Sequence, residues 1–319
     1  MISQSLLQRG RFFLVRADPL IPKKACQMRA RFRYTLFTIA AAVGLLGWGA
    51  FVTSIDAGLA VPDWPSSFDS FDPFNPWPEW WRVTPILAEH GHRLVGALVG
   101  FFTLILAAWT WKSDERLWMR MLGIAALALV IFQGVLGGLR VVWVSLDLAV
   151  VHACVAQLFF ALLASMALFT SSRWDNPGPR PSLDFPKAGW IAAGAVYIQI
   201  FLGALLRHPG IGIDPMLAGL HMGWAFVALL AVSIHARVLL SGAGLAPLGR
   251  SLVGVVVLQV ALGFVAYFIL LDEQGMLQPS NLQVVVNSLH LIVGASLFAL
   301  NVVGALASSR ARTLSPVIS

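Results

Sequence analysis

Charged residues are scarce in this sequence. Only 12% of its 319 residues are Asp, Glu, Lys or Arg, whereas 58% are hydrophobic and the mean hydropathy is +0.79. A soluble domain carries about 25% charged residues. Because so few charges cannot cover a surface in water, the composition excludes a soluble globular enzyme and a disordered chain.

Cysteine is nearly absent as well. Cys26 and Cys154 are the only two, which excludes a disulfide-rich secreted module and a zinc site built from cysteines.

The net charge of +7 at first suggests nucleic-acid binding. However, eight of the 22 Lys and Arg residues lie in the first 33 residues, and most others lie in short segments between apolar runs. This distribution indicates membrane topology, and no nucleic-acid partner is expected.

Eight apolar runs are long enough to cross a bilayer as helices, which takes about 20 residues each. They are too long for strands and lack the alternating pattern of strands. We therefore expect an all-α integral membrane protein with eight transmembrane helices. The expected spans are 35–55, 88–111, 119–143, 148–170, 188–206, 215–236, 250–271 and 282–307.

Lys and Arg predict the orientation, because they are enriched in cytoplasmic segments. One side of the predicted membrane holds 18 of the 22, in the N-terminal tail, three loops and the C-terminus, whereas the opposite loops are acidic. Both termini are therefore expected in the cytoplasm. The basic tail is interpreted as an anchor for this orientation. A transit peptide is the alternative, because Asp18 is the only acidic residue of the tail.

The first outer loop, at about 56–87, is long and rich in Pro and Trp. We expect it to lie on the membrane surface as a lid. Trp77, Trp80 and Trp81 fit an aromatic belt at the headgroup level, where indole rings are favoured.

An internal repeat predicts two pseudo-symmetric four-helix bundles. Similar residues recur in the same order in both halves, and four helices return the chain to its starting side, so the two copies share one topology. The matched pairs are Gly49 with Gly203, His92 with His221, Gln133 and Gly137 with Gln259 and Gly263, and His152 with His290. The expected divisions are a tail at 1–34, halves at 35–172 and 186–308, and a tail at 309–319.

Four histidines recur once on each even-numbered span, within about two turns of its outer end. They are His92, His152, His221 and His290. Ionisable groups in a membrane are costly and usually functional. Two imidazoles facing each other across a four-helix bundle suit the axial ligation of haem, whereas zinc requires a larger ligand cluster. For a single histidine a helix–helix hydrogen bond is the favoured interpretation, but for four at matching positions of a repeat it is not.

The other three histidines have weaker interpretations. His208 is expected in an outer loop, and His235 is expected at the interface near a cytoplasmic helix end. His90 faces away from the average direction of its neighbours.

A carboxylate distinguishes the two halves. Glu89 lies three residues before His92, on the same helix face, whereas Ala218 holds the matching position before His221. Glu89 is therefore predicted to handle protons, to position a substrate or to orient the histidine, with a hydrogen bond at the headgroup boundary as the alternative. Three arginines near outer helix ends fit either haem propionate partners or side chains that extend to the headgroups: Arg93, Arg140 and Arg207.

These residues resemble the haem A synthases of the CtaA/Cox15 family over about residues 35–308. The resemblance rests on TSIDAGL at 53–59, PDWP at 62–65, EHGHRLVG at 89–96, Gln133-Gly134 with Gly137-Gly138, and the later His152, His221 and His290. It implies a membrane-bound, haem-dependent oxidoreductase that converts the C8 methyl of haem O to the formyl of haem A for terminal-oxidase biogenesis.

The family also implies roles for residues. His92 and His152 would serve the substrate haem in the first half, His221 and His290 would bind a haem b cofactor in the second, and Glu89 would be catalytic. Haem O synthase and the assembling cytochrome oxidase are implied as partners beside membrane lipid, and a homo-oligomer is left open. Many members carry a cysteine pair in outer loops, which this sequence lacks, so the electron donor or acceptor is undefined.

The family places the protein in the bacterial cytoplasmic membrane, with the mitochondrial inner membrane as the alternative. A different function explains the four histidines equally well, namely a quinone-linked di-haem b electron-transfer cytochrome, but it does not explain why one half alone has the carboxylate. A transporter is a third hypothesis, which leaves the paired histidines unexplained.

Overall fold

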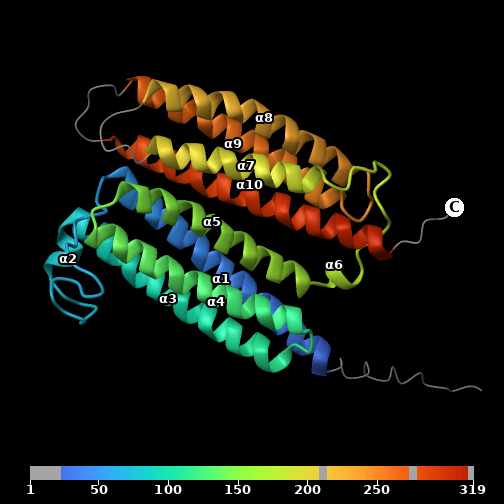
Figure 1. Cartoon of the computed structure of the whole chain (residues 1–319), viewed down its shortest axis with the longest axis horizontal. Helices are drawn as coiled ribbons and strands as arrows, with labels where there is room; N and C mark the ends of the chain where they lie inside the picture. The colour runs from blue at the N-terminus through green and yellow to red at the C-terminus, as the bar shows by residue number, and fades with distance from the viewer. Residues whose placement is uncertain (1–22, 208–213, 273–278, 315–319) are drawn as a thin grey trace, which may run out of the picture.

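The structure is a computed structural model that describes residues 23–207, 214–272 and 279–314 (Figure 1). Its backbone is almost entirely helical, and the described residues contain no strand beyond an isolated bridge between Ser67 and Ser70. The helices are α1 (Lys23–Ser54), α2 (Glu79–Arg82), α3 (Thr84–Ser113), α4 (Leu117–Val142), α5 (Leu146–Phe169), α6 (Ser172–Asp175), α7 (Ala188–Arg207), α8 (Pro215–Leu240), α9 (Ala246–Asp272) and α10 (Asn281–Leu314).

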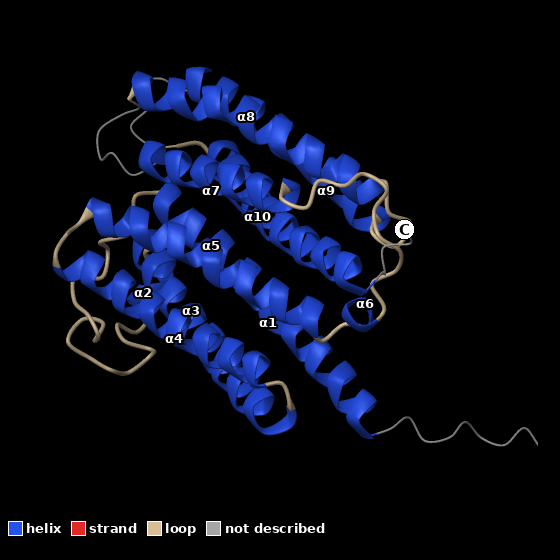
Figure 2. Cartoon of the chain, turned by 45° about the vertical axis from the view of Figure 1, so that its right-hand side comes forward, coloured by secondary structure: helices blue, strands red, loops and turns tan. Residues whose placement is uncertain are grey.

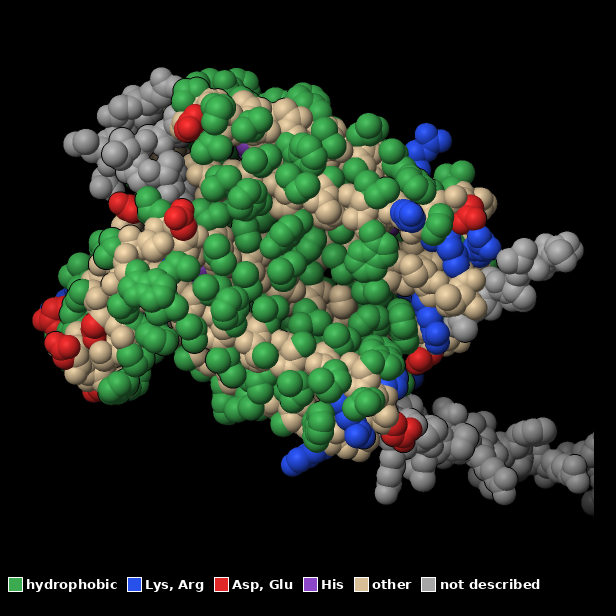
Figure 3. All heavy atoms as spheres, in the orientation of Figure 1, with side chains coloured by type: hydrophobic (Ala, Val, Ile, Leu, Met, Phe, Trp, Pro, Cys, Tyr) green, Lys and Arg blue, Asp and Glu red, His purple; other side chains and the backbone are tan. Residues whose placement is uncertain are grey.

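Eight of these helices are long and apolar enough to cross a membrane, which confirms the predicted fold class. They are α1, α3, α4, α5, α7, α8, α9 and α10. Large apolar side chains cover their outer faces (Figure 3), as lipid contact requires. In the same view, most of the visible Lys and Arg side chains lie at the end of the molecule where α10 ends, and most of the Asp and Glu lie at the opposite end. This separation of charge matches the predicted loops, whereas the orientation across the membrane stays a prediction.

The eight helices form two closed sets of four (Figures 1 and 2). In the first set α1 packs on α3, α3 on α4, α4 on α5 and α5 on α1, and in the second α7, α8, α9 and α10 pack in the same cyclic order. The two sets meet where α5 and α1 contact α10 and where α5 contacts α7. Small residues such as Ala192 and Ala295 are buried in the core, because close approach of helices in lipid depends on them. Symmetry between the sets stays a prediction.

The first helix begins earlier than its apolar run. Residues 23–34 were expected to belong to a tail, but they form the first turns of α1. The helix can begin this early because the buried charge of Arg31 has a partner. Arg31 is 2% exposed and donates to Ser113 Oγ at 2.9 Å and to Asp114 Oδ2 at 2.5 Å. Because Asp114 also pairs with Arg116 at 2.8 Å, this end of α1 is tied to the turn between α3 and α4. Burial alone would raise the pKa of Asp114, but hydrogen bonds from Arg116 and the charge of Arg31 lower it.

Candidate functional site

The four repeated histidines lie near the starts of four different helices. His92 is on α3, His152 on α5, His221 on α8 and His290 on α10. In each ring the Nδ1 atom is buried and has no hydrogen-bond partner among the described residues. An unpartnered buried nitrogen is costly, and its recurrence in four rings suits an arrangement in which these rings hold a ligand.

Each of these rings packs against a glycine of the preceding long helix. A Cβ atom added to the glycine would lie 3.0 to 3.4 Å from the Cε1 atom of the imidazole, so in the tighter pairs the ring would have to shift by a few tenths of an ångström. The pairs are Gly49 with His92, Gly137 with His152, Gly203 with His221, and Gly263 with His290. The glycines therefore provide the space that the rings occupy.

Three glutamines, each four residues before such a glycine, also reach the histidines. The side-chain amide of Gln133 donates to His152 O at 3.1 Å, and that of Gln199 donates to His221 O at 3.0 Å. The amides of Gln199 and Gln259 also lie 3.1 and 3.2 Å from Nε2 of His221 and His290, respectively. Gln199 was missed in the sequence, although its spacing to Gly203 equals that of the other two pairs.

The first helix is the exception to this pattern. Leu45 holds the position four residues before Gly49, so no glutamine of this series faces His92. The rings of the second set are therefore held by amides, whereas neither ring of the first set accepts such a bond from a described residue.

The distance between the second pair of rings suits two ligands of one iron. The ring centres of His221 and His290 lie 6.5 Å apart, with their planes at 63°. Two metal–nitrogen bonds of about 2 Å each would place the ring centres roughly 6 Å apart. In the first pair, His92 lies near His152, and Arg140 lies near both rings. No cluster of three or more His, Cys, Asp or Glu suited to a metal ion occurs among the described residues, so the donor set fits a porphyrin iron better than zinc.

Glu89 lies beside the first pair and is almost completely buried, at 5% exposure. Its Oε2 accepts a hydrogen bond from the backbone N–H of Val61 at 2.8 Å, and its Oε1 pairs with Arg93 at 2.9 Å. Its charge also interacts with that of Arg140. Glu89 therefore connects the first outer loop to α3, and its partners are protein groups rather than lipid headgroups.

Arg93 holds the same loop from α3. Its guanidinium donates to the backbone oxygens of Asp63 at 2.7 Å, Ser66 at 3.1 Å and Val61 at 2.9 Å, in addition to Glu89. With four acceptors already in the protein, Arg93 is better suited to hold the loop than to pair with a propionate. Met222, which holds the matching position in the predicted repeat, can do neither.

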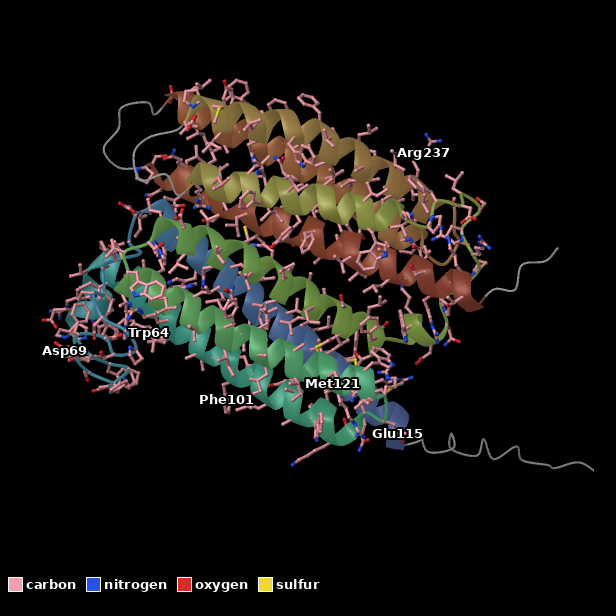
Figure 4. All side chains as sticks on the ribbon, viewed as in Figure 1. Trp64, Asp69, Phe101, Glu115, Met121 and Arg237 are labelled. Carbon is pink, nitrogen blue, oxygen red and sulfur yellow. The ribbon has the colours of Figure 1, made fainter. Side chains whose placement is uncertain are left out.

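The loop is folded by its own contacts and by His90. His90 is buried, with Nε2 2.8 Å from Pro73 O and Nδ1 3.3 Å from Ser67 Oγ. It therefore points into the loop, away from the ligand position, as the helix geometry predicted. The ring of Trp64 lies directly on the backbone of Gly138, where an added Cβ would be 2.2 Å from the ring (Figure 4).

Asp63 organises the loop locally. Its carboxylate accepts hydrogen bonds from the Ser66 hydroxyl and from the backbone N–H groups of Phe68 at 2.7 Å and Asp69 at 3.0 Å. Burial acts to raise the pKa of Asp63, but these hydrogen bonds outweigh it and lower the pKa. The predicted lid is thus a folded segment. Two of the three tryptophans expected in an aromatic belt, Trp77 and Trp81, are exposed on its surface, whereas the Nε1 atom of Trp80 is buried.

The two other arginines predicted as propionate partners differ from each other. Arg140 lies against Gly58 and donates no hydrogen bond to a described residue. Arg207 donates to Ala50 O at 2.7 Å and to the Ser54 hydroxyl, so it links α7 to α1. Arg140, close to the first pair and without an acceptor among the described residues, is therefore the best placed of the three to receive a carboxylate.

The expectation for His235 was wrong. This residue is buried at 1% exposure rather than interfacial, because its Nδ1 pairs with Asn301 Oδ1 at 2.8 Å and its ring packs against Gly189 and Gly304. His208 lies outside the described residues. Cys154 is free and buried within α5.

Comparisons with known proteins point to one family. A family described as cytochrome oxidase assembly protein (COX15-CtaA) matches residues 32–215, more than half of the chain. That segment contains Glu89, His92 and His152.

Relatives named heme A synthase occur in several bacteria. The protein of Lysinibacillus sphaericus (strain C3-41) is 33% identical over 187 residues, covering 54% of this chain and 57% of the relative. That of Alkalihalophilus pseudofirmus is 30% identical over 180 residues, covering 55% and 59%, and that of Shouchella clausii (strain KSM-K16) is 28% identical over 169 residues, covering 50% and 53%. The chain thus spans somewhat more than half the length of these relatives.

Proposed function

Because the chain belongs to the COX15-CtaA family of cytochrome oxidase assembly proteins, we propose that it is a membrane-bound oxidoreductase that converts haem O to haem A. The relatives named heme A synthase support this activity. The observation that carries the proposal is the asymmetry of the two histidine pairs. Both pairs lie on glycines, but only the first has a buried carboxylate, Glu89, on the preceding helical turn.

The two pairs are assigned different haems. His92 and His152, in the half at 35–172, ligate the substrate haem O, and His221 and His290, in the half at 186–308, ligate a haem b cofactor. The buried carboxylate of Glu89 beside the first pair supports this division, since Ala218 holds the matching position before His221.

In the net reaction a methyl group and one water molecule yield a formyl group, four protons and four electrons, so an electron acceptor is also required. The bound haems supply the iron redox chemistry that such an oxidation requires. The imidazoles would fix the position of the substrate, and Arg93 and Glu89 hold the folded loop beside the first pair. Glu89 is the carboxylate that accepts protons there, and Arg140 pairs with a propionate of the substrate.

The bilayer setting suits this substrate. Haem O carries a long farnesyl chain, and eight membrane-crossing helices provide an apolar surrounding for it. The bacterial relatives support a location in the cytoplasmic membrane, and the basic end of the bundle is assigned to the cytoplasm. Haem O synthase and the assembling terminal oxidase are the proposed partners in supply and delivery.

A conversion assay tests the proposal. The chain is expressed in a bacterium that makes haem O but lacks its own haem A-forming enzyme, and extracted haems are separated by chromatography. We expect haem A in cells with the wild-type chain and none with the vector. Haem O that stays unconverted although the purified protein carries haem would contradict the proposal, and haem b as the only extracted pigment would favour the di-haem electron-transfer cytochrome.

A further inference from the structure

An apolar groove lies between the two sets of helices, away from the histidines. Trp118 of α4 and Leu162 and Phe169 of α5 form one wall, and Trp190 of α7 and Val302 and Leu306 of α10 form the other. Its volume is about 300 Å³, at the lower end of the range for sites that take small ligands. It lies toward the basic end of the molecule, where α4 begins and α10 ends (Figures 1 and 3).

The lining of the groove suits a hydrocarbon chain. Ser165 is its one polar lining residue, and the hydroxyl of Ser165 already donates to Ala161 O at 2.8 Å. Apart from the indole N–H groups of Trp118 and Trp190, the walls therefore offer a ligand no free polar side-chain group. Trp118 and Trp190 are 43% and 48% exposed, so the groove is open along the side that faces lipid.

Two arginines lie at the end of the groove. The guanidinium of Arg116 lies 4.9 Å from the ring centre of Trp118, which forms part of the wall. Arg310 lies 5.0 Å from the ring centre of Trp174, and this ring contacts Phe169 at 4.6 Å between centres. Both cations are thus connected to the wall of the groove through aromatic rings.

The charge at this end is only partly neutralised. Arg116 donates to both oxygens of Asp114 and to Phe169 O. Arg310 donates through Nε to Trp174 O at 3.3 Å, but its two terminal amino groups donate to no described residue. A guanidinium fork of this kind matches a phosphate group.

From these contacts we propose that the groove binds an anionic phospholipid. One acyl chain lies between α5 and α10, and the headgroup phosphate pairs with Arg310, with Arg116 adding a second positive charge. Basic pockets between membrane helices bind anionic headgroups in this manner. The lipid would join the two helix sets at the end opposite the histidines. This site does not depend on the proposed reaction with haem.

Native mass spectrometry of the purified full-length protein tests the site. The protein is delipidated in detergent and titrated with phosphatidylglycerol or with phosphatidylcholine of the same acyl chains. We expect the wild type to bind one phosphatidylglycerol in preference to phosphatidylcholine, and Arg310→Gln to lose about five-fold in that preference, because one cation near the surface contributes such a factor. Arg237→Gln is the matched control, since this exposed arginine on α8 lies away from the groove (Figure 4).

A second variant tests whether the acyl chain of the lipid lies in the groove. Leu162→Trp fills the groove and is expected to lose binding of both lipids, provided that its melting temperature stays near that of the wild type. If it fails to fold, the comparison of Arg310→Gln with Arg237→Gln decides. Equal binding of the two phospholipids by the wild type, or equal losses in the two arginine variants, would overturn the proposal.

Discussion

The imidazole rings of His221 and His290 lie 6.5 Å apart between centres with their planes at 63°, each packed on a glycine of the neighbouring helix. This relationship joins residues that are 69 positions apart on α8 and α10. It depends on the absence of side chains at Gly203 and Gly263. The glycines can therefore be tested independently of the histidines.

Substitution of Gly263 by valine is expected to disrupt the second pair. A Cβ there would lie 3.2 Å from Cε1 of His290, and the two methyl groups of valine would displace the ring. We predict a haem b affinity at least about ten-fold weaker, in the range of losses seen when the surroundings of a metal ligand are altered. The measurement is haem per protein by absorption spectroscopy. Gly254→Val on the same helix is the control, because nothing lies within 4 Å of its added Cβ, and equal losses in both variants would argue against the packing account.

Two substitutions at Glu89 separate its contacts from its charge. Glu89→Ala removes the acceptor for Val61 and Arg93 and is expected to abolish haem A formation while haem b stays bound. Glu89→Gln keeps an oxygen that can accept the Val61 N–H but cannot accept protons, so activity should still fall by about 10²- to 10⁴-fold. Both are measured in the conversion assay. Full activity of Glu89→Gln would show that Glu89 serves only to hold the loop.

The loop should loosen in acid. Because hydrogen bonds lower the pKa of Asp63, its stabilising contribution is complete above the unfolded value of about 3.9 and is lost as the pH falls through the lower folded value. Hydrogen–deuterium protection factors at Phe68 and Asp69 should therefore be constant from about pH 5 to 8 and fall below about pH 4. In Asp63→Ala they should be low throughout. Protection that is unchanged in Asp63→Ala would refute this role for Asp63.

Much of the fold could be predicted from the sequence, because a membrane imposes simple rules. Length and hydropathy placed all eight spans within a few residues of their observed ends, apart from the end of α10, which runs to Leu314 instead of 307 and so includes part of the expected tail at 309–319, and the start of α1. That start depends on a partner far along the chain: Arg31 is buried only because Asp114 reaches it from the turn after α3. No local pattern contains this information.

The candidate site was predictable where it repeats. Histidines and glycines that recur in order indicated the pairs, and the same repeat could have revealed Gln199, four residues before Gly203. The roles of His90 and Arg93 were not predictable, because both bind backbone atoms of a loop that has no counterpart in the second half. Arg207 likewise contacts α1 across the interface of the two helix sets, which the repeat cannot show.

Haem analysis of the purified histidine variants tests the central claim most directly. Alanine at His221 or His290 should remove haem b, whereas alanine at His92 or His152 should leave haem b in place and remove haem O and haem A from the extract. Visible spectra and chromatography of the extracted pigments report both quantities. A wild-type protein without haem, or four variants with the same loss, would contradict two separate imidazole pairs.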